Sequence, residues 1–125
     1  MRPFFAATVL YLSSVAFSFA QPQFKFDDTR HNFGFVHQGV LVKLEYAFTN
    51  TGNEPIVITN AKVACNCTVV DFPQNPVKPG EKGIVKISFD TNGKYDRQDR
   101  TVDIISNAEG SPHQLRFKGV VLKKK

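Results

Sequence analysis

The chain has 125 residues, which suits one domain with a single hydrophobic core, and a formal net charge of +5. Its basic residues are not interleaved with aromatic side chains along a stripe, so nucleic-acid binding has little support. The sequence contains no glycine-rich phosphate loop, no HExxH and no GxSxG, which argues against several common catalytic classes.

Residues 1–20 have the organisation of a secretory signal peptide. A long apolar stretch follows the positively charged Arg2 and ends with Ser18-Phe19-Ala20, which places small residues at the cleavage site. The stretch is shorter than the roughly 20 apolar residues of a membrane-spanning helix, and no basic stop-transfer cluster follows it. We therefore expect cleavage after Ala20, a secreted or periplasmic mature domain of residues 21–125, and no transmembrane segment in that domain.

The mature chain alternates with the period of two that is typical of β-strands. In chain order, the expected strands are 24–28, 31–39, 40–50, 55–63, 83–90, 100–107 and 113–121. Most of them place apolar residues on one parity only, which predicts one buried face. The stretch 55–63 is β-branched and begins with apolar residues on both parities, which predicts a more deeply buried strand. The residues expected to face the core are Val40, Val42, Leu44, Tyr46, Phe48, Val85, Ile87, Phe89, Val102, Ile104, Leu115, Phe117 and Val121.

Turn-forming residues separate these stretches. Asn50–Asn53 contains Gly52, which is free to adopt a positive φ, and Pro79-Gly80, Asn92-Gly93 and 107–112 mark further reversals. No stretch of the mature chain has a convincing helical period. The pattern predicts an all-β protein, an immunoglobulin-like antiparallel β-sandwich of about seven strands, with phenylalanines as the main filling of its core.

Cys65 and Cys67, separated by Asn66, form the candidate site. In a regular strand their Cα atoms would lie about 7 Å apart, the upper limit for a disulfide, so the backbone must bend if the bond forms. Export favours oxidation, and a small ring of this kind is easily reduced. Three interpretations stay open: a local disulfide or partly buried thiols at a sheet edge, a Cu(I) or zinc site, and thiol–disulfide exchange without a Cys-x-x-Cys motif.

Few other residues suggest chemistry. A metal site would have to take its nitrogen ligands from three histidines, none of which the sequence places near the cysteines: His31, His37 and His113. We interpret His31 as a hydrogen-bonded structural residue. A run of alternating charges indicates a solvated strand or loop face rather than paired catalytic carboxylates: Asp96, Arg97, Asp99, Arg100 and Asp103. We therefore assign no catalytic residue and no cofactor.

An ordered set of motifs covers nearly the whole mature chain. An HxFGxVxxG pattern (His31 to Gly39) is followed by FTNTGNEPIVI at 48–58, CNCT at 65–68, NPVKPGEKGIVKISFD at 75–90, and strands that end in SN and FKGVV. In this order the motifs resemble the bacterial domain-of-unknown-function 1573 family over roughly residues 24–121.

This resemblance implies an immunoglobulin-like sandwich, distantly similar to ASPM/SPD-2/Hydin and major-sperm-protein type domains. It also implies a secreted protein with a Cys-x-Cys-Thr motif, and no specific activity. The chain departs from the pattern at Asn32, where Asp is usual, and at Asn66, where Gly is usual. Because Asn tolerates left-handed backbone geometry, the same turn is still possible at Asn66.

Together these observations predict a non-enzymatic secreted or periplasmic module that binds a protein or cell-envelope partner through a sheet edge or loop end. The alternative is a metal-binding (copper or zinc) or thiol-redox accessory protein that uses Cys65 and Cys67. An added ligand beside the pair would favour a metal site, whereas an exposed pair with a perturbed thiol pKa would favour redox chemistry.

Overall fold

The computed structural model describes residues 21–124, so the predicted signal peptide lies outside the described residues. Eight strands make up the fold: β1 (Phe24–Phe26), β2 (Arg30–His37), β3 (Leu41–Asn50), β4 (Ile58–Val63), β5 (Thr68–Asp71), β6 (Lys82–Asp90), β7 (Asp96–Ser106) and β8 (His113–Leu122). Within the described range, no helix is long and apolar enough to cross a membrane.

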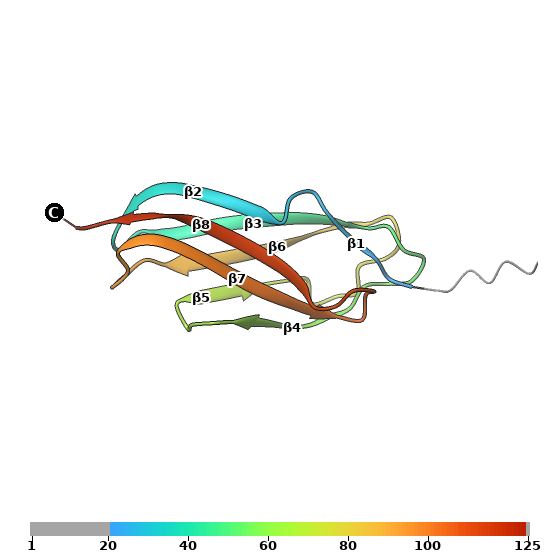
Figure 1. Ribbon diagram of the computed structural model, residues 1–125. Helices are drawn as coiled ribbons and strands as arrows, with labels where there is room; N and C mark the ends of the chain where they lie inside the picture. Colours follow the sequence, from blue (N-terminus) through green and yellow to red (C-terminus); the bar gives the residue numbers. More distant parts are fainter. Residues whose placement is uncertain (1–20, 125) are drawn as a thin grey trace, which may run out of the picture.

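The strands form two four-stranded sheets, in the orders β1-β3-β6-β5 and β2-β8-β7-β4. The sheets face each other as two layers, with the start and the finish of the described chain at opposite ends (Figure 1). The predicted all-β sandwich is therefore confirmed, with two differences. The strands β2 and β8 pair in parallel, whereas the other pairings are antiparallel. The additional strand is β5, whose four residues directly after the cysteines are too few to show an alternating pattern.

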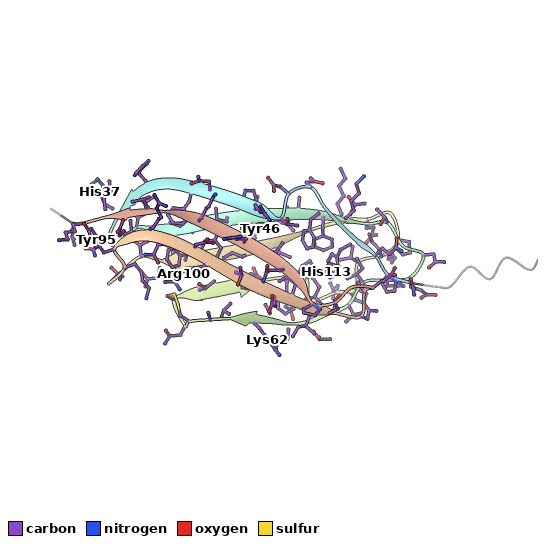
Figure 2. The ribbon with its side chains drawn as sticks, in the orientation of Figure 1. His37, Tyr46, Lys62, Tyr95, Arg100 and His113 are labelled. Carbon is purple, nitrogen blue, oxygen red and sulfur yellow. A yellow bond between two sulfur atoms is a disulfide. The ribbon has the colours of Figure 1, made fainter. Side chains whose placement is uncertain are left out.

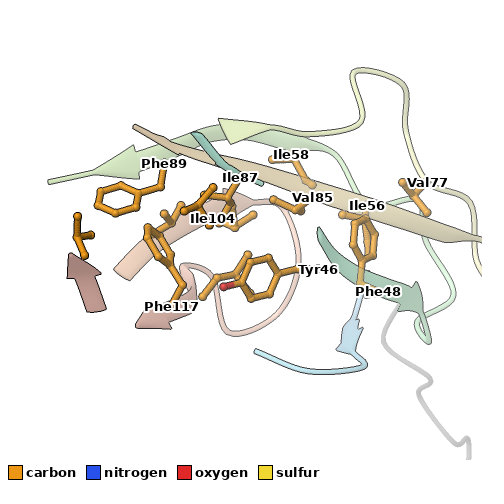
Figure 3. Close-up of a cluster of buried hydrophobic side chains, with 14 residues drawn as sticks. Tyr46, Phe48, Ile56, Ile58, Val77, Val85, Ile87, Phe89, Ile104 and Phe117 are labelled. Carbon is orange, nitrogen blue, oxygen red and sulfur yellow. The ribbon is translucent and has the colours of Figure 1, made fainter. Parts of the chain in front are cut away.

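The core lies between the two sheets and is lined by the inward faces of β3, β6, β7 and β8 (Figure 3). The buried side chains include nearly all of those expected from parity: Val42, Tyr46, Phe48, Val85, Ile87, Phe89, Val102, Ile104, Leu115, Phe117 and Val121. Leu44 is half-buried. The prediction for Val40 was wrong, because this residue precedes β3 and is 44% exposed.

The expectation of a deeply buried strand at 55–63 was also wrong. The strand β4 is at the edge of its sheet, where it pairs only with β7 and has a register irregularity between Ile58 and Asn60. Ile58 is buried, but Val57 and Val63 are exposed. An edge strand of a sandwich has one face toward the core, so apolar residues on its other parity remain in contact with solvent.

The turn after β3 depends on close packing at Gly52 rather than on a left-handed backbone. The expected positive φ is absent: the glycines with positive φ are at other positions. A Cβ atom on Gly52 would instead overlap the backbone of Gln21 and Gln23. Glycine is required here because the N-terminal segment crosses directly over the turn.

Asn50 closes the same turn from inside, and its side chain is 1% exposed. Its Nδ2 group donates to the carbonyl oxygens of Glu54 at 2.7 Å and Val77 at 2.9 Å. Its Oδ1 atom accepts from the backbone N–H groups of Gly52 at 2.9 Å and Gln23 at 3.4 Å. The side chain thus satisfies four backbone groups from three separate segments.

A β-bulge in β2 reverses the direction of its side chains. The register with β8 shifts between Asn32 and Gly34, and Gly34 has a φ of 76°. Asn32 Oδ1 accepts from the Gly34 N–H at 2.8 Å and closes the bulge. Phe33 therefore packs inward, where its ring occupies the space of a Cβ on Gly119, whereas Phe35 points outward and is 75% exposed.

Candidate functional site

Cys65 and Cys67 lie in the corner where the chain passes from β4 in one sheet to β5 in the other. The backbone bends and turns at these residues, and their Cα atoms are 5.3 Å apart, with the two sulfurs joined as a disulfide (Figure 2, yellow). The Cys67 N–H donates to Cys65 Sγ at 3.2 Å, and the Thr68 N–H donates to the Cys65 carbonyl at 3.3 Å. Among non-glycine residues of the described chain only Asp96 has a positive φ, so Asn66 forms this turn without left-handed geometry.

Arg100 also lies at this corner, although the sequence pattern did not identify it as a neighbour of the cysteines. Its Nη1 atom donates toward Cys65 Sγ at 3.5 Å, and its guanidinium carbon lies 5.0 Å from the centre of the Phe89 ring. The Nη2 group donates to Gln98 Oε1 at 2.9 Å, whereas Nε is buried and has no hydrogen-bond partner. The corner therefore contains a half-buried cation that contacts one sulfur of the pair.

The placement of Arg100 on a solvated face was wrong. On β7, Gln98 and Arg100 share the inward parity of Val102 and Ile104, whereas Asp99 is exposed on the other side. Extending the alternation of the two buried aliphatic residues toward the start of the strand would have placed Arg100 inside. The alternating charges hid this signal, because a charge run is usually a solvated face.

The structure does not gather histidines around the cysteines. In the part of the chain that the structure describes, no group of three or more His, Cys, Asp or Glu residues could hold a metal ion. His31 packs edge-on against Tyr46 with ring centres 4.3 Å apart, His113 packs against Phe24 at 4.8 Å, and His37 is exposed at the end of β2. The Arg100 cation also repels any metal cation at Cys65 Sγ.

A second feature is the outer surface of β2, β8 and β7, which we call the basic face: Arg30, Phe35, Arg97, Arg116 and Lys118. Cross-strand register places Phe35, Val120 and Arg97 in one row and Asn32, Lys118 and Asp99 in the next. A hollow of about 350 Å³ lies around Phe35, Arg97 and Lys118. An adjoining hollow of about 300 Å³ is lined by Arg30, His31, Asn32, Arg116 and Lys118.

The basic face has more positive than negative charge. Arg116 forms an ion pair and a second hydrogen bond with Asp99, and this hydrogen bonding holds the pKa of the Asp99 carboxyl below its usual range. No other ion pair within 4 Å is found among the described residues. Arg30, Arg97 and Lys118 therefore have no carboxylate at that distance.

The basic face is held from inside by Tyr46 on β3. Its hydroxyl crosses between the sheets and donates to the Arg116 carbonyl at 2.7 Å. Burial, with a smaller effect from Asp28, raises the pKa of Tyr46 above its ordinary value, so the hydroxyl keeps its proton. This bond fixes the backbone of β8 directly beneath the Arg116 side chain.

The family model described as "Protein of unknown function (DUF1573)" matches residues 24–121. The chain belongs to this family. The resemblance inferred from the motifs is thereby confirmed. No curated protein matches the sequence.

Solved structures show the fold that this DUF1573 domain shares with other proteins. A protein of unknown function from Porphyromonas gingivalis W83 has a TM-score of 0.71 and 18% identity, covering 86% of this chain and 51% of that one. The DUF1573 chain thus spans about half the length of that protein.

More distant structures agree. PapD-like domain 7 of human CEP192, an ASH domain, has a TM-score of 0.64 and 10% identity, covering 98% of this chain and 100% of that one. The YadV chaperone has a TM-score of 0.52 and 11% identity, covering 82% of this chain and 53% of that one. The structural likeness shows an immunoglobulin-like, PapD-like sandwich. At identities this low it says nothing about activity.

Proposed function

We propose that this protein is an exported binding module without catalytic activity, and that its basic face docks an acidic segment of a partner protein. The observation that carries the proposal is Phe35, which is 75% exposed between unpaired cations on a sheet face. Export is supported by the signal-like residues 1–20 and by the paired cysteines, since disulfides persist in oxidising compartments.

Phe35 has the properties of an interface anchor. Full burial of a phenylalanine side chain contributes about 1.5–3 kcal/mol, which the isolated domain forgoes at this position. The bulge at Gly34 is what turns Phe35 away from the core, so its exposure is built into the backbone. Aromatic and arginine side chains are also the residues most enriched at the energetic centres of interfaces.

The cations around Phe35 favour acidic protein segments. Three of the four cationic residues of the basic face are arginines, whose planar guanidinium groups bind carboxylates with two parallel hydrogen bonds. An excess of positive charge also speeds the encounter with an acidic partner and makes it sensitive to salt. The YadV chaperone shares the fold, and this likeness is compatible with a binding role.

A photo-crosslinking experiment tests the docking surface. A photoreactive phenylalanine analogue is placed at Phe35 or, as a control, at Ile84, which is 42% exposed on β6 of the other sheet. In the cells that make the protein, we expect a discrete crosslinked partner from position 35 and none from position 84. Equal crosslinking at both positions, or no partner at position 35, would contradict the proposal.

Charge reversal identifies the chemistry of the partner. Arg97→Glu together with Lys118→Glu should abolish the position-35 crosslink, because an acidic segment is then repelled. The matched control reverses Lys43 and Lys86, which are exposed on the other sheet, and should leave the crosslink intact. If both double variants retain the crosslink, the partner does not recognise the cations of the basic face.

A further inference from the structure

Arg100 is a half-buried cation without an anion beside it. Its guanidinium stacks on Phe89 and donates to the neutral Gln98 amide and to Cys65 Sγ, while its Nε is buried without a partner. Among the described residues, the one ion pair joins Arg116 to Asp99 and does not include Arg100. Desolvating a cation without a counter-ion is costly, so the corner favours any state that places negative charge near Arg100.

Reduction of the disulfide would supply that charge. A thiolate at Cys65 would lie against the Arg100 guanidinium, and a neighbouring arginine is one of the features that stabilises cysteine thiolates in proteins. The two sulfurs differ in this respect, since Cys67 Sγ lies 3.8 Å from the neutral Thr68 hydroxyl and its side chain packs against the core. Cys65 is therefore the better leaving group of the pair.

The position of the disulfide argues against a purely structural role. Its cysteines are two residues apart, so it closes a very small loop, and the entropic stabilisation by a disulfide increases with loop length. It joins neither the two sheets nor two distant segments. Asn66 between the cysteines is exposed, and the corner is flanked by the edge strands β4 and β5, where a partner chain can approach.

We propose that Cys65 and Cys67 undergo stoichiometric thiol–disulfide exchange with a dithiol protein, and that Arg100 sets its direction by stabilising the Cys65 thiolate. A thiolate of the dithiol attacks Cys67 Sγ, the Cys65–Cys67 bond breaks, and its electron pair remains on Cys65 beside Arg100. The second thiol of the dithiol loses its proton to water and attacks its own partner sulfur in the mixed disulfide. Cys67 leaves as a thiolate and takes up a proton from water.

The net reaction moves two electrons from the dithiol, which becomes a disulfide, to the cysteine pair. In the reverse sequence the Cys67 thiolate attacks a disulfide partner and forms the mixed disulfide. The Cys65 thiolate then attacks Cys67 Sγ, which re-forms the Cys65–Cys67 bond and releases the partner sulfur, so the partner is reduced by two electrons. Arg100 acts through Cys65 Sγ, so it is a positioning residue in this scheme. The exchange is independent of the basic face and can take place whether or not that face has a partner.

The first test uses the purified wild-type domain in glutathione buffers, with alkylation and intact mass to measure the reduced fraction. We expect the folded protein to be reduced by excess glutathione, whereas structural disulfides resist that pool. At a pH where the Cys65 thiolate predominates, Arg100→Gln should lower the equilibrium constant for reduction by up to about tenfold, because the thiolate loses the cation that stabilises it. Arg100→Lys should restore part of it, and Lys43→Gln, a charge removal on the far sheet, should not alter it.

The second test measures the reactivity of each sulfur by itself and does not depend on the Arg100→Gln variant alone. Cys67→Ser leaves Cys65 as the single thiol, and Cys65→Ser leaves Cys67. Reaction with neutral dithiodipyridine at pH 7 should be several-fold faster for Cys65, and adding Arg100→Gln should slow Cys65 but not Cys67. The proposal is overturned if the folded wild type stays oxidised in excess glutathione, or if Cys65 reacts no faster than Cys67.

Discussion

Replacing the buried Asn50 with aspartate should destabilise the domain severely, although the two side chains have nearly the same shape. The amide orientation is determined by its partners: Nδ2 faces the carbonyl oxygens of Glu54 and Val77, and Oδ1 faces two backbone N–H groups. In Asn50→Asp an oxygen replaces Nδ2 and faces both carbonyls. The variant therefore keeps the accepted hydrogen bonds and loses the donated ones.

The expected loss follows from these two carbonyls. Each lost hydrogen bond removes about 1 kcal/mol, and leaving buried carbonyl oxygens opposite a carboxylate adds a penalty of about 1–3 kcal/mol. The sum, about 3–5 kcal/mol, is a large part of the 5–15 kcal/mol that a domain of this size typically has. It corresponds to a fall in Tm of more than about 10 °C.

Urea unfolding followed by tyrosine fluorescence measures this loss, since the chain has three tyrosines and no tryptophan. The matched control is Asn53→Asp in the same turn, where the exposed side chain accepts from the Gln21 N–H through Oδ1 and a carboxylate can do the same. The control should change the free energy of unfolding by less than about 0.5 kcal/mol. A loss below about 1 kcal/mol for Asn50→Asp, with an unchanged m-value, would refute the role assigned to Nδ2.

Three further predictions concern His113, Gly119 and the mass of the exported chain. Burial holds the pKa of His113 below its ordinary value of about 6.5, so the folded state favours the neutral ring. The free energy of unfolding should therefore decrease as the pH falls below about 6.5. In urea titrations at pH 5 and 7.5, His113→Gln should flatten this pH dependence, and the exposed His37→Gln should not. Gly119→Ala should cost about 1–3 kcal/mol in the same assay because the new Cβ overlaps the Phe33 ring, and adding Phe33→Leu should recover part of the loss. Intact mass of the protein from the cell envelope or medium should show a chain that begins at Gln21 and lacks two hydrogens relative to its reduced form; a chain that retains residues 1–20 would refute the proposed export.

The fold could be predicted because burial of one face of a strand produces an alternating pattern of apolar residues in the sequence. The alternation of Val85, Ile87 and Phe89 identified both the strand β6 and its inward face. The same logic failed for β4, since the pattern of a stretch does not reveal how many neighbours a strand has. It also could not reveal the parallel pairing of β2 with β8, because register between distant strands depends on the whole sandwich.

The candidate sites were predicted only in part. The bend at Cys65 and Cys67 follows from their spacing, but the partner Arg100 is 35 residues away and meets them only after folding. Phenylalanine was expected to be core filling, and Phe35 is the exception because the bulge at Gly34 shifts the parity of β2. A glycine between two phenylalanines was the available signal for that bulge, and it is too common a pattern to be decisive alone.

The parallel pairing of β2 with β8 has a consequence for the order of events during folding. These strands are nearly the first and the last of the chain, and they pair from Arg30 with Arg116 to His37 with Leu122. A chain that is synthesised from its N-terminus therefore holds β2 without its partner until β8 has been made. Contacts between such distant segments slow folding and leave unpaired strands exposed to other chains in the meantime. Until β8 has been made, one sheet therefore lacks the strand that joins β2 to β7, and the sandwich cannot close.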